Sequence, residues 1–282
     1  MEPIVLLIGP TGYVGKAFCK HLSKSGVSFV AMSGIREHGY GEARLRFMFR
    51  YHPSIKVVIN CGGYVGKPNV DACEHDKPSC MYANAILPAK MAKVCHEYGV
   101  GFAHVGSGCI YSGGPHSESS TPNFSGSWYS YTKLMSERLL LDLDNVWIWR
   151  IRMPFDGNFE SKEKRCLLAK LASYSRIVEA TNSLTYLPDF VKNAWECIQN
   201  DLPKGIWNMV HPDPINNSEI IEMISRHGLC GSKEIIGVRE FESFVETPRS
   251  FCVLDSSKAA SFGIGFRPVR EALELALTIA EN

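Results

Sequence analysis

The sequence lacks three features that would each point to a class of protein: a block of basic residues, an apolar run of membrane-spanning length, and the spacing C-x-x-C. Thirty basic and 29 acidic residues leave a formal net charge of +1, which argues against a nucleic acid partner. The missing apolar run argues against a membrane protein. Because the N-terminal stretch becomes strand-like almost at once, without a basic region or cleavage site, we expect a soluble cytoplasmic protein.

Neither the histidines nor the cysteines give any sign of a metal centre or a disulfide framework. The nine histidines show no ligand spacing, so we expect no metal site. The ten cysteines are scattered and lie mostly in apolar or helical surroundings, which suits reduced thiols in the cytosol. At 282 residues with 45% hydrophobic content, the chain is long enough for one large α/β domain or for a domain with a smaller lobe.

Short β-branched runs alternate with helical patterns through the first half of the chain. The runs are "IVLLIG", "SFVAMS", "KVVINC", "GFAHVGS" and "VWIWRIRM", and the helical patterns fall at 12–25, 40–51, 78–98 and 128–143. This alternation predicts a doubly wound α/β fold of the Rossmann type, whose parallel sheet is covered on both faces. From about residue 155 the pattern loosens. We expect a smaller lobe there, with helical stretches such as 187–200 free to return to the first domain.

A glycine triplet marks the turn between the first expected strand and the first expected helix. Gly9, Gly12 and Gly15 lie in "IGPTGYVGK". Glycines at these places permit a tight turn, let the backbone approach a pyrophosphate, and let the helix pack closely while its N-terminus faces the anion. Because a strand precedes the triplet and a helix follows it, the pattern favours dinucleotide binding over an ordinary sharp turn.

The end of the second expected strand indicates which dinucleotide is bound. It reads "VAMSGIRE" and has no acidic residue at its tip, where an NAD enzyme places a carboxylate on the ribose 2′-hydroxyl. Ser33 and Arg36 are candidates to hold a 2′-phosphate instead, which favours NADPH. For Arg36 taken alone, a solvated surface arginine is the competing interpretation.

A tyrosine and a lysine four residues apart open the helix at about residue 128. Tyr129 and Lys133 lie in "SWYSYTKLMSERLL", so they share one helix face. A nearby ammonium favours the phenolate and lowers the pKa of a tyrosine, which makes that tyrosine a usable acid or base near neutrality. Without further context, such a pair is more often plain helix surface.

Taken together, Gly9, Gly12, Gly15, Ser107 and the pair of Tyr129 with Lys133 resemble the extended short-chain dehydrogenase/reductase family. The stretches at 62–74, 83–95, 121–133, 146–154 and 247–255 narrow the resemblance to the dTDP-4-dehydrorhamnose reductase group. Within that group the sequence is most similar to the nucleotide-rhamnose synthase/epimerase-reductase enzymes of plants. The similarity covers nearly the whole chain and is weakest around 36–52 and 228–246.

The resemblance implies a reaction in which NADPH reduces the carbon-4 carbonyl of a nucleotide 4-keto-6-deoxyhexose. Tyr129 would protonate the developing alkoxide, Lys133 would hold the nicotinamide ribose and tune Tyr129, and Ser107 would hydrogen-bond the substrate oxygen. Residues 1–154 would then form the NADPH-binding domain with these catalytic groups, and 155–282 mainly the substrate-binding lobe. Further cofactor contacts implied by the resemblance are Tyr13, Val14, Asn60, Gly62, Asn84, Met153 and Pro154. For Asn84, an ordinary polar helix residue is the alternative.

The stretch "GSGCIYSGG" places Cys109 two residues beyond Ser107, where the related GDP-fucose synthases carry an epimerising cysteine. The resemblance makes Cys109 the base that removes protons from carbons 3 and 5, provided that its pKa falls below the usual 8.5 or so. Lys170, in "KRCLLAKLASY", aligns with the lysine that the rhamnose-forming enzymes use. The alternatives are an inert buried thiol for Cys109 and solvated helix surface for Lys170.

Two further residues are expected to bind the substrate. Arg249, in "TPRSFCVLD", corresponds to a family arginine, and a guanidinium suits bidentate contact with a diphosphate. Asn158 lies in the family's segment between cofactor and substrate, and Cys109 and Lys170 would also touch the sugar.

The leading hypothesis is a bifunctional 3,5-epimerase/4-reductase that converts UDP-4-keto-6-deoxyglucose to UDP-L-rhamnose with NADPH and acts as a homodimer. The alternatives are a dTDP-4-dehydrorhamnose reductase without epimerase activity and a non-catalytic dinucleotide-binding regulatory subunit. Whether the substrate carries uridine or thymidine stays open.

Overall fold

The computed structural model describes residues 2, 4–34, 40–67, 69–159 and 165–281, and these residues form two compact units. The first unit comprises Met1–Ile110, Ser127–Arg150 and Asp201–Trp207, and the second comprises Tyr111–Gly126, Ile151–Asn200 and Asn208–Asn282. These bounds differ from the expected division at residue 154. The segment 111–126 belongs to the second unit, 201–207 belongs to the first, and 187–200 stays with the second.

A six-stranded sheet organises the first unit. Its strands are β1 (Val5–Ile8), β2 (Phe29–Met32), β3 (Val57–Asn60), β4 (Gly101–Ser107), β6 (Val146–Ile151) and β11 (Gly205–Asn208). Their order across the sheet is β11-β6-β4-β3-β1-β2, and β1 pairs in parallel with both β2 and β3. Every residue of β1, β3 and β6 is buried, because both faces of the sheet are covered.

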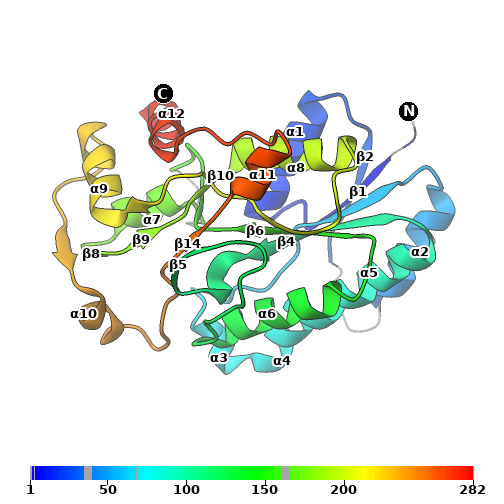
Figure 1. Cartoon of the computed structure of the whole chain (residues 1–282), viewed down its shortest axis with the longest axis horizontal. Coiled ribbons are helices and arrows are strands. Elements are labelled where there is room, and N and C mark those ends of the chain that lie inside the picture. Colours follow the sequence, from blue (N-terminus) through cyan, green and yellow to red (C-terminus); the bar gives the residue numbers. More distant parts are fainter. Residues whose placement is uncertain (1, 3, 35–39, 68, 160–164, 282) are drawn as a thin grey trace. The chain divides into compact units, whose positions relative to one another are not determined.

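The helices of this unit lie on both faces of the sheet, as Figure 1 shows. They are α1 (Tyr13–Lys24), α2 (Tyr40–Tyr51), α3 (Ala72–His75), α4 (Lys77–Met81), α5 (Leu87–Glu97) and α6 (Trp128–Leu140). The helices α2, α5 and α6 pack side by side on the face opposite α1. The predicted doubly wound α/β fold of the Rossmann type is therefore confirmed.

Apolar and aromatic side chains pack against both faces of the sheet. On the face of α2 and α5, a large apolar cluster forms, with Leu45, Phe49, Met91 and Phe102 among its members. On the α1 face, Phe18 stacks against Trp149 of β6 at 5.9 Å between ring centroids.

The second unit is built from short elements instead of one large sheet. Its strands are β5 (Gly113–His116), β7 (Pro154–Phe155), β8 (Arg176–Val178), β9 (Thr181–Asn182), β10 (Thr185–Tyr186), β12 (Ile215–Asn216), β13 (Glu234–Ile236) and β14 (Cys252–Leu254). They pair as β10-β7, β12-β9, β13-β8 and β14-β5. Its helices are α7 (Leu167–Ser173), α8 (Leu187–Gln199), α9 (Asn217–Arg226), α10 (Val238–Glu242), α11 (Ser257–Ser261) and α12 (Val269–Glu281).

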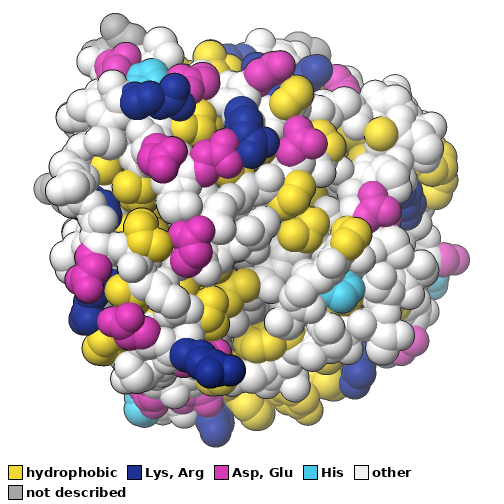
Figure 2. All heavy atoms as spheres, turned by 60° about the vertical axis from the view of Figure 1, so that its left-hand side comes forward, with side chains coloured by type: hydrophobic (Ala, Val, Ile, Leu, Met, Phe, Trp, Pro, Cys, Tyr) yellow, Lys and Arg dark blue, Asp and Glu magenta, His cyan; other side chains and the backbone are white. Residues whose placement is uncertain are grey.

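Charged side chains of both signs are interspersed on the face of the molecule shown in Figure 2. Ion pairs in the second unit include those of Arg270 with Glu219 and of Arg226 with Glu274. In the part of the chain that the structure describes, no helix combines the length and the apolar character needed to cross a bilayer.

Candidate functional site

The turn between β1 and α1 is packed too tightly for any residue but glycine at two positions. Gly9 adopts φ +75°, and a Cβ atom on it would lie 3.0 Å from the backbone nitrogen of Gly62. A Cβ atom on Gly15 would lie only 2.0 Å from the carbonyl oxygen of Gly9. The first turn of α1 therefore rests directly on the preceding loop, which brings the helix N-terminus to the end of β1.

The N-terminus of α1 fits a pyrophosphate. Gly12 is its N-cap, and the first turn, all of it within the described residues, contains neither a side-chain cap nor an acidic residue. The backbone N–H groups of a first helical turn lack partners inside the helix, and the helix dipole adds positive potential there. Tyr13, Val14 and Gly15, predicted from sequence to contact the cofactor, form this turn.

The loop after β3 is held by a buried polar chain. Asn60 accepts a hydrogen bond on Oδ1 from the Gly62 N–H at 2.9 Å, and its Nδ2 lies 3.1 Å from Nδ1 of His104. On the other side of the ring, Nε2 of His104 lies 3.3 Å from Oγ of Ser136. Burial holds the pKa of His104 well below its usual value, so the ring stays neutral and links the loop to α6.

Asn84 lies in a single π-helical stretch, Tyr82–Ile86, between α4 and α5. Its side chain accepts from the Tyr64 N–H at 2.7 Å and donates to the Tyr64 carbonyl at 2.8 Å. It also donates to Oγ1 of Thr132 at 3.1 Å. π-Helical turns often occur at functional sites. Here the turn lets one buried amide hold the Tyr64 loop and α6 together, which makes Asn84 a positioning residue in this structure.

Ser107, Cys109, Tyr129 and Lys133 come together in the first unit. Ser107 ends β4 and is hydrogen-bonded to the side chain of Tyr129. The backbone N–H of Cys109 donates to Oγ of Ser107 at 3.1 Å. Lys133, one turn beyond Tyr129 on α6, donates from Nζ to the carbonyl of Val105 at 3.0 Å. The sequence pattern thus brings a hydroxyl, a phenol, a thiol and an ammonium to the end of one strand.

The pKa of Tyr129 differs from the sequence-based expectation. The sequence predicts that Lys133 lowers it, but in the structure the pKa of Tyr129 is raised, chiefly by burial and then by the electrostatic influence of Cys109. The hydrogen bond with Ser107 opposes this shift without cancelling it. Because desolvation favours the uncharged phenol, Tyr129 stays protonated and is suited to donate a proton.

The pKa of Lys133 is shifted in the direction expected of a buried cation. The residue is 8% exposed, and burial lowers the pKa of its ammonium from 10.5 to about 8. Nearby Cys109, Cys80 and Glu137 oppose the shift. Lys133 therefore carries its charge at neutral pH and loses it just above.

Other predicted site residues belong to the second unit. Lys170 of α7 is half-buried, and burial, followed by the charge of Arg165, lowers its pKa. Arg249 is half-buried and donates from Nη1 to the carbonyl and hydroxyl oxygens of Thr247 at 2.8 and 2.7 Å.

Met153, Pro154 and Asn158 also lie in that unit. Met153 adopts φ +38°, a strained value for a residue other than glycine and one that clusters at functional sites. Pro154 pairs with Thr185 in the β7-β10 ladder. Asn158 is exposed, and its N–H donates to Oδ1 of Asp156 at 3.0 Å.

The two residues predicted to hold a 2′-phosphate have different outcomes. Ser33 is exposed just beyond β2, whereas Arg36 lies outside the described residues.

Sequence reasoning missed His104, Ser136 and Thr132, whose contacts join β4, α6 and the loop after β3. No local pattern marks them, because their partners are 32 to 48 residues away.

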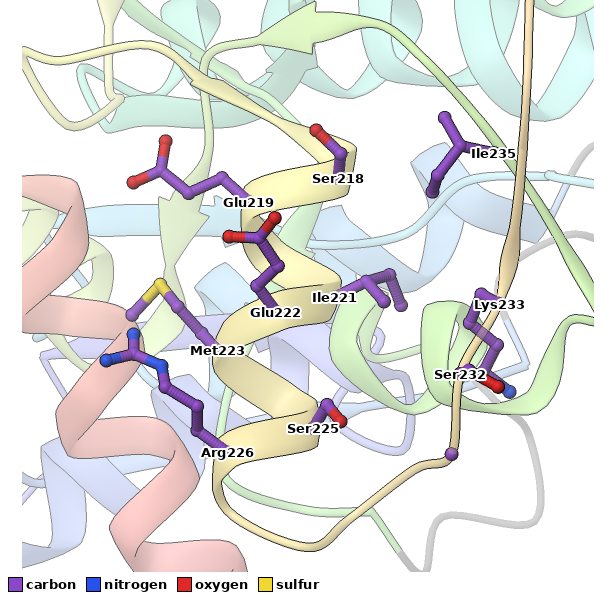
Figure 3. A pocket seen from close by; sticks show the side chains of 11 residues that line it. Ser218, Glu219, Ile221, Glu222, Met223, Ser225, Arg226, Ser232, Lys233 and Ile235 are labelled. Carbon is purple, nitrogen blue, oxygen red and sulfur yellow. The ribbon is translucent and has the colours of Figure 1, made fainter.

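A separate pocket in the second unit contains none of the predicted site residues. It has a volume of about 770 Å³ and is lined by α9 and by the chain leading into β13, as Figure 3 shows. Three of its charged groups have partners: Glu219 pairs with Arg270, Arg226 with Glu274, and Lys233 donates to the carbonyl of Ala172 at 2.7 Å. Glu222, which also lines the pocket, is exposed.

Comparison with known proteins identifies a family. A family model described as RmlD substrate binding domain matches residues 2–199. A bifunctional dTDP-4-dehydrorhamnose 3,5-epimerase/dTDP-4-dehydrorhamnose reductase of Arabidopsis thaliana is 32% identical over 283 residues, which cover 95% of this chain and 90% of that protein.

Longer relatives match as well. A trifunctional UDP-glucose 4,6-dehydratase/UDP-4-keto-6-deoxy-D-glucose 3,5-epimerase/UDP-4-keto-L-rhamnose-reductase of Arabidopsis thaliana is 34% identical over 230 residues, which cover 77% of this chain and 33% of that protein. Across three such trifunctional relatives, the match spans 33 to 41% of their length.

Solved structures share the fold. The UDP-rhamnose synthase of Acanthamoeba polyphaga mimivirus superposes with a TM-score of 0.88 at 23% identity, covering 99% of this chain and 100% of that chain. A dTDP-4-dehydrorhamnose reductase of Bacillus anthracis in complex with NADP superposes with a TM-score of 0.79 at 16% identity, covering 97% of each chain.

The lowered pKa of Lys133 predicts a change of stability with pH. Between about pH 8 and pH 10.5 the folded state binds fewer protons at this site than the unfolded state does, so the free energy of unfolding rises with pH. The gain should reach about 3 kcal/mol. Denaturant unfolding of the wild type and Lys133→Met across this range measures it as the difference between the two proteins.

A matched control is Lys93→Met, which removes an exposed lysine from the neighbouring helix α5 and should follow the wild-type curve. A wild type and a Lys133→Met variant whose stabilities run parallel over the whole range would show that Lys133 is not desolvated as described.

Proposed function

The chain belongs to the RmlD substrate binding domain family, and on that premise we propose that it is an NADPH-dependent 4-keto reductase of nucleotide sugars. We further propose that it carries out 3,5-epimerisation, so that UDP-4-keto-6-deoxyglucose leaves as UDP-L-rhamnose. The observation that carries the proposal is the meeting of Ser107, Tyr129 and Lys133 at the end of β4. A binding module has no need of that convergence.

The residues of the chain divide the reduction between them. NADPH, when bound, supplies the hydride that reaches carbon 4 of the keto-sugar. Ser107 orients the carbonyl oxygen through its hydroxyl, and the protonated phenol of Tyr129 gives its proton to that oxygen as the C–H bond forms. The buried Lys133 ammonium stabilises the phenolate left behind, because opposite charges attract strongly in a desolvated site.

The cofactor assignment has support from the glycine-rich turn. The uncapped N-terminus of α1 fits a pyrophosphate, and the described tip of β2, Ser33 and Gly34, carries no carboxylate for a ribose 2′-hydroxyl. Gly9 and Gly15 let this turn pack closely against Gly62 and against the start of α1, the close packing that a dinucleotide-binding turn requires. These features support NADPH as the hydride donor.

Epimerisation needs a base and an acid in addition to the reduction machinery. Removal of a proton from carbon 3 or carbon 5 leaves an enolate stabilised by the carbon-4 carbonyl, and return of a proton from the opposite face inverts the centre. Cys109 is the proposed base. It is half-buried, unlike the six cysteines that are fully buried, and it lies beside Ser107.

Lys170 is the proposed acid. Burial lowers the pKa of its ammonium, which makes the proton easier to release. Arg249 is proposed to bind the diphosphate of the substrate. UDP and dTDP substrates are both named among the relatives, and we favour UDP. The homodimer and the cytoplasmic location expected from the sequence stay predictions.

The reduction step predicts the behaviour of Tyr129→Phe. Loss of the proton donor should lower turnover about 100- to 10,000-fold while the fold and NADPH affinity are kept. Tyr131→Phe, which removes a hydroxyl from the same helix, is the matched control and should stay near wild-type. Lys133→Ala should lose activity and cofactor affinity together. Steady-state kinetics measures the turnover, and titration with NADPH measures the cofactor affinity. A Tyr129→Phe enzyme that reduces the keto-sugar at the wild-type rate would refute the catalytic assignment.

The epimerisation step predicts an isotope result in deuterated water. Wild-type enzyme with NADPH and UDP-4-keto-6-deoxyglucose should place deuterium at carbons 3 and 5 of a rhamnose-configured product, as read by NMR. Cys109→Ala should abolish this exchange, because the base is missing, while still reducing the unepimerised ketone slowly. Lys170→Ala should show a partial defect, since water can return a proton to an exposed enolate.

The control here is Cys230→Ala, which removes another half-buried thiol and should exchange normally. Undiminished exchange at both carbons in Cys109→Ala would make Cys109 a packing residue. A pure reductase would accept only sugar that had already been epimerised, and a regulatory subunit would incorporate no deuterium at all.

A further inference from the structure

The tip of β2 is held by an arginine from the following helix. Nη1 of Arg44, on α2, donates to the carbonyl oxygen of Ser33 at 3.1 Å and lies 3.4 Å from that of Gly34. Gly34 adopts φ +70°, a left-handed turn that presents both carbonyls to the same guanidinium. Arg44 itself is exposed, so the anchored head faces solvent.

Arg46, the next arginine on α2, has a carboxylate partner, whereas Arg44 hydrogen-bonds to backbone carbonyls. Arg46 pairs with Glu97 at 2.5 Å and lies over the ring of Tyr98. Among the described residues, Arg44 has no carboxylate partner within ion-pair distance, and its two hydrogen bonds use Nη1 alone. A guanidinium has five N–H donors in a fixed planar fork, so Nε and Nη2 are left to meet an anion.

The position of this guanidinium follows from the register of the sheet. Met32, the last residue of β2, pairs with Ile8, the last residue of β1. The Gly9 N–H then donates to the Met32 carbonyl at 3.0 Å. The tip of β2 is therefore bonded directly to the glycine-rich turn. In Rossmann folds a dinucleotide whose pyrophosphate lies at this turn places its adenine ribose at the end of the second strand.

We propose that Arg44 is the residue that recognises the 2′-phosphate of NADPH. The inference rests on the proposed function, and it assigns to a residue of α2 the role that sequence reasoning gave to Arg36. The two carbonyls at the β2 tip fix one end of the fork, so the guanidinium is oriented before the ligand arrives. A guanidinium in a fixed orientation binds a phosphate with two parallel N–H···O bonds.

Calorimetric titration with four probes tests the assignment: NADPH, NADH, 2′,5′-ADP and 5′-AMP. Relative to the wild type, Arg44→Ala should weaken NADPH and 2′,5′-ADP binding by about 10- to 100-fold, the range expected for hydrogen bonds to a charged group. Binding of NADH and 5′-AMP should stay unchanged, which also shows that the variant is folded. Arg44→Lys should fall between the two, because it keeps the charge but loses the fork. Arg46→Ala is the matched control and should bind all four probes as the wild type does.

The outcomes separate this inference from the proposed function. If Arg44→Ala prefers NADPH over NADH as strongly as the wild type does, the assignment of Arg44 is overturned and the reductase proposal stands. Equal weakening of all four probes would also overturn it, because Arg44 would then support the fold of the turn and not the phosphate. A wild type that binds neither dinucleotide would contradict the proposed function and, with it, this inference.

Discussion

The helix α6 is held to the sheet mainly by buried polar contacts, and the positions of Tyr129 and Lys133 in the first unit depend on them. Of its seven buried residues, five are polar or charged. Glu137 accepts two hydrogen bonds from Arg150 of β6, at 2.8 and 2.5 Å, and both side chains are almost completely buried. Removal of either partner from such a pair leaves a buried charge uncompensated, which typically costs about 3–5 kcal/mol.

Buried polar contacts specify geometry more narrowly than apolar packing does. An apolar face can slide by a fraction of a turn at little cost, whereas a buried donor that loses its acceptor is penalised at once. Three buried hydrogen bonds therefore fix both the rotation and the translation of α6. They join Lys133 to Val105, Ser136 to His104, and Thr132 to Asn84. Tyr129 is placed as a consequence, one turn before Lys133 and beside Ser107. Two of these contacts, through His104 and Asn84, also hold the loop after β3, so α6 is linked to the loop that packs against Gly9.

Much of this arrangement can be predicted from the sequence, since it depends on local patterns. The apolar runs predict β1 and β3, the glycine spacing predicts the turn at Gly9, and the spacing of Tyr129 and Lys133 predicts a shared helix face. The features that the sequence does not predict depend on contacts between segments that are far apart in the chain. Nothing near His104 indicates that it bridges Asn60 and Ser136. The direction of the Tyr129 pKa was wrong because the sequence shows its charged neighbour but not its burial.

The proposed function requires that the first unit deliver hydride from NADPH to carbon 4 of a nucleotide keto-sugar. NADPH deuterated at the transferable position of the nicotinamide, incubated with the protein and UDP-4-keto-6-deoxyglucose without any separate epimerase, tests that directly by NMR of the product. We predict a UDP-rhamnose that carries deuterium at carbon 4, with one NADPH oxidised for each sugar reduced. An unreduced sugar with NADPH left intact would contradict the account.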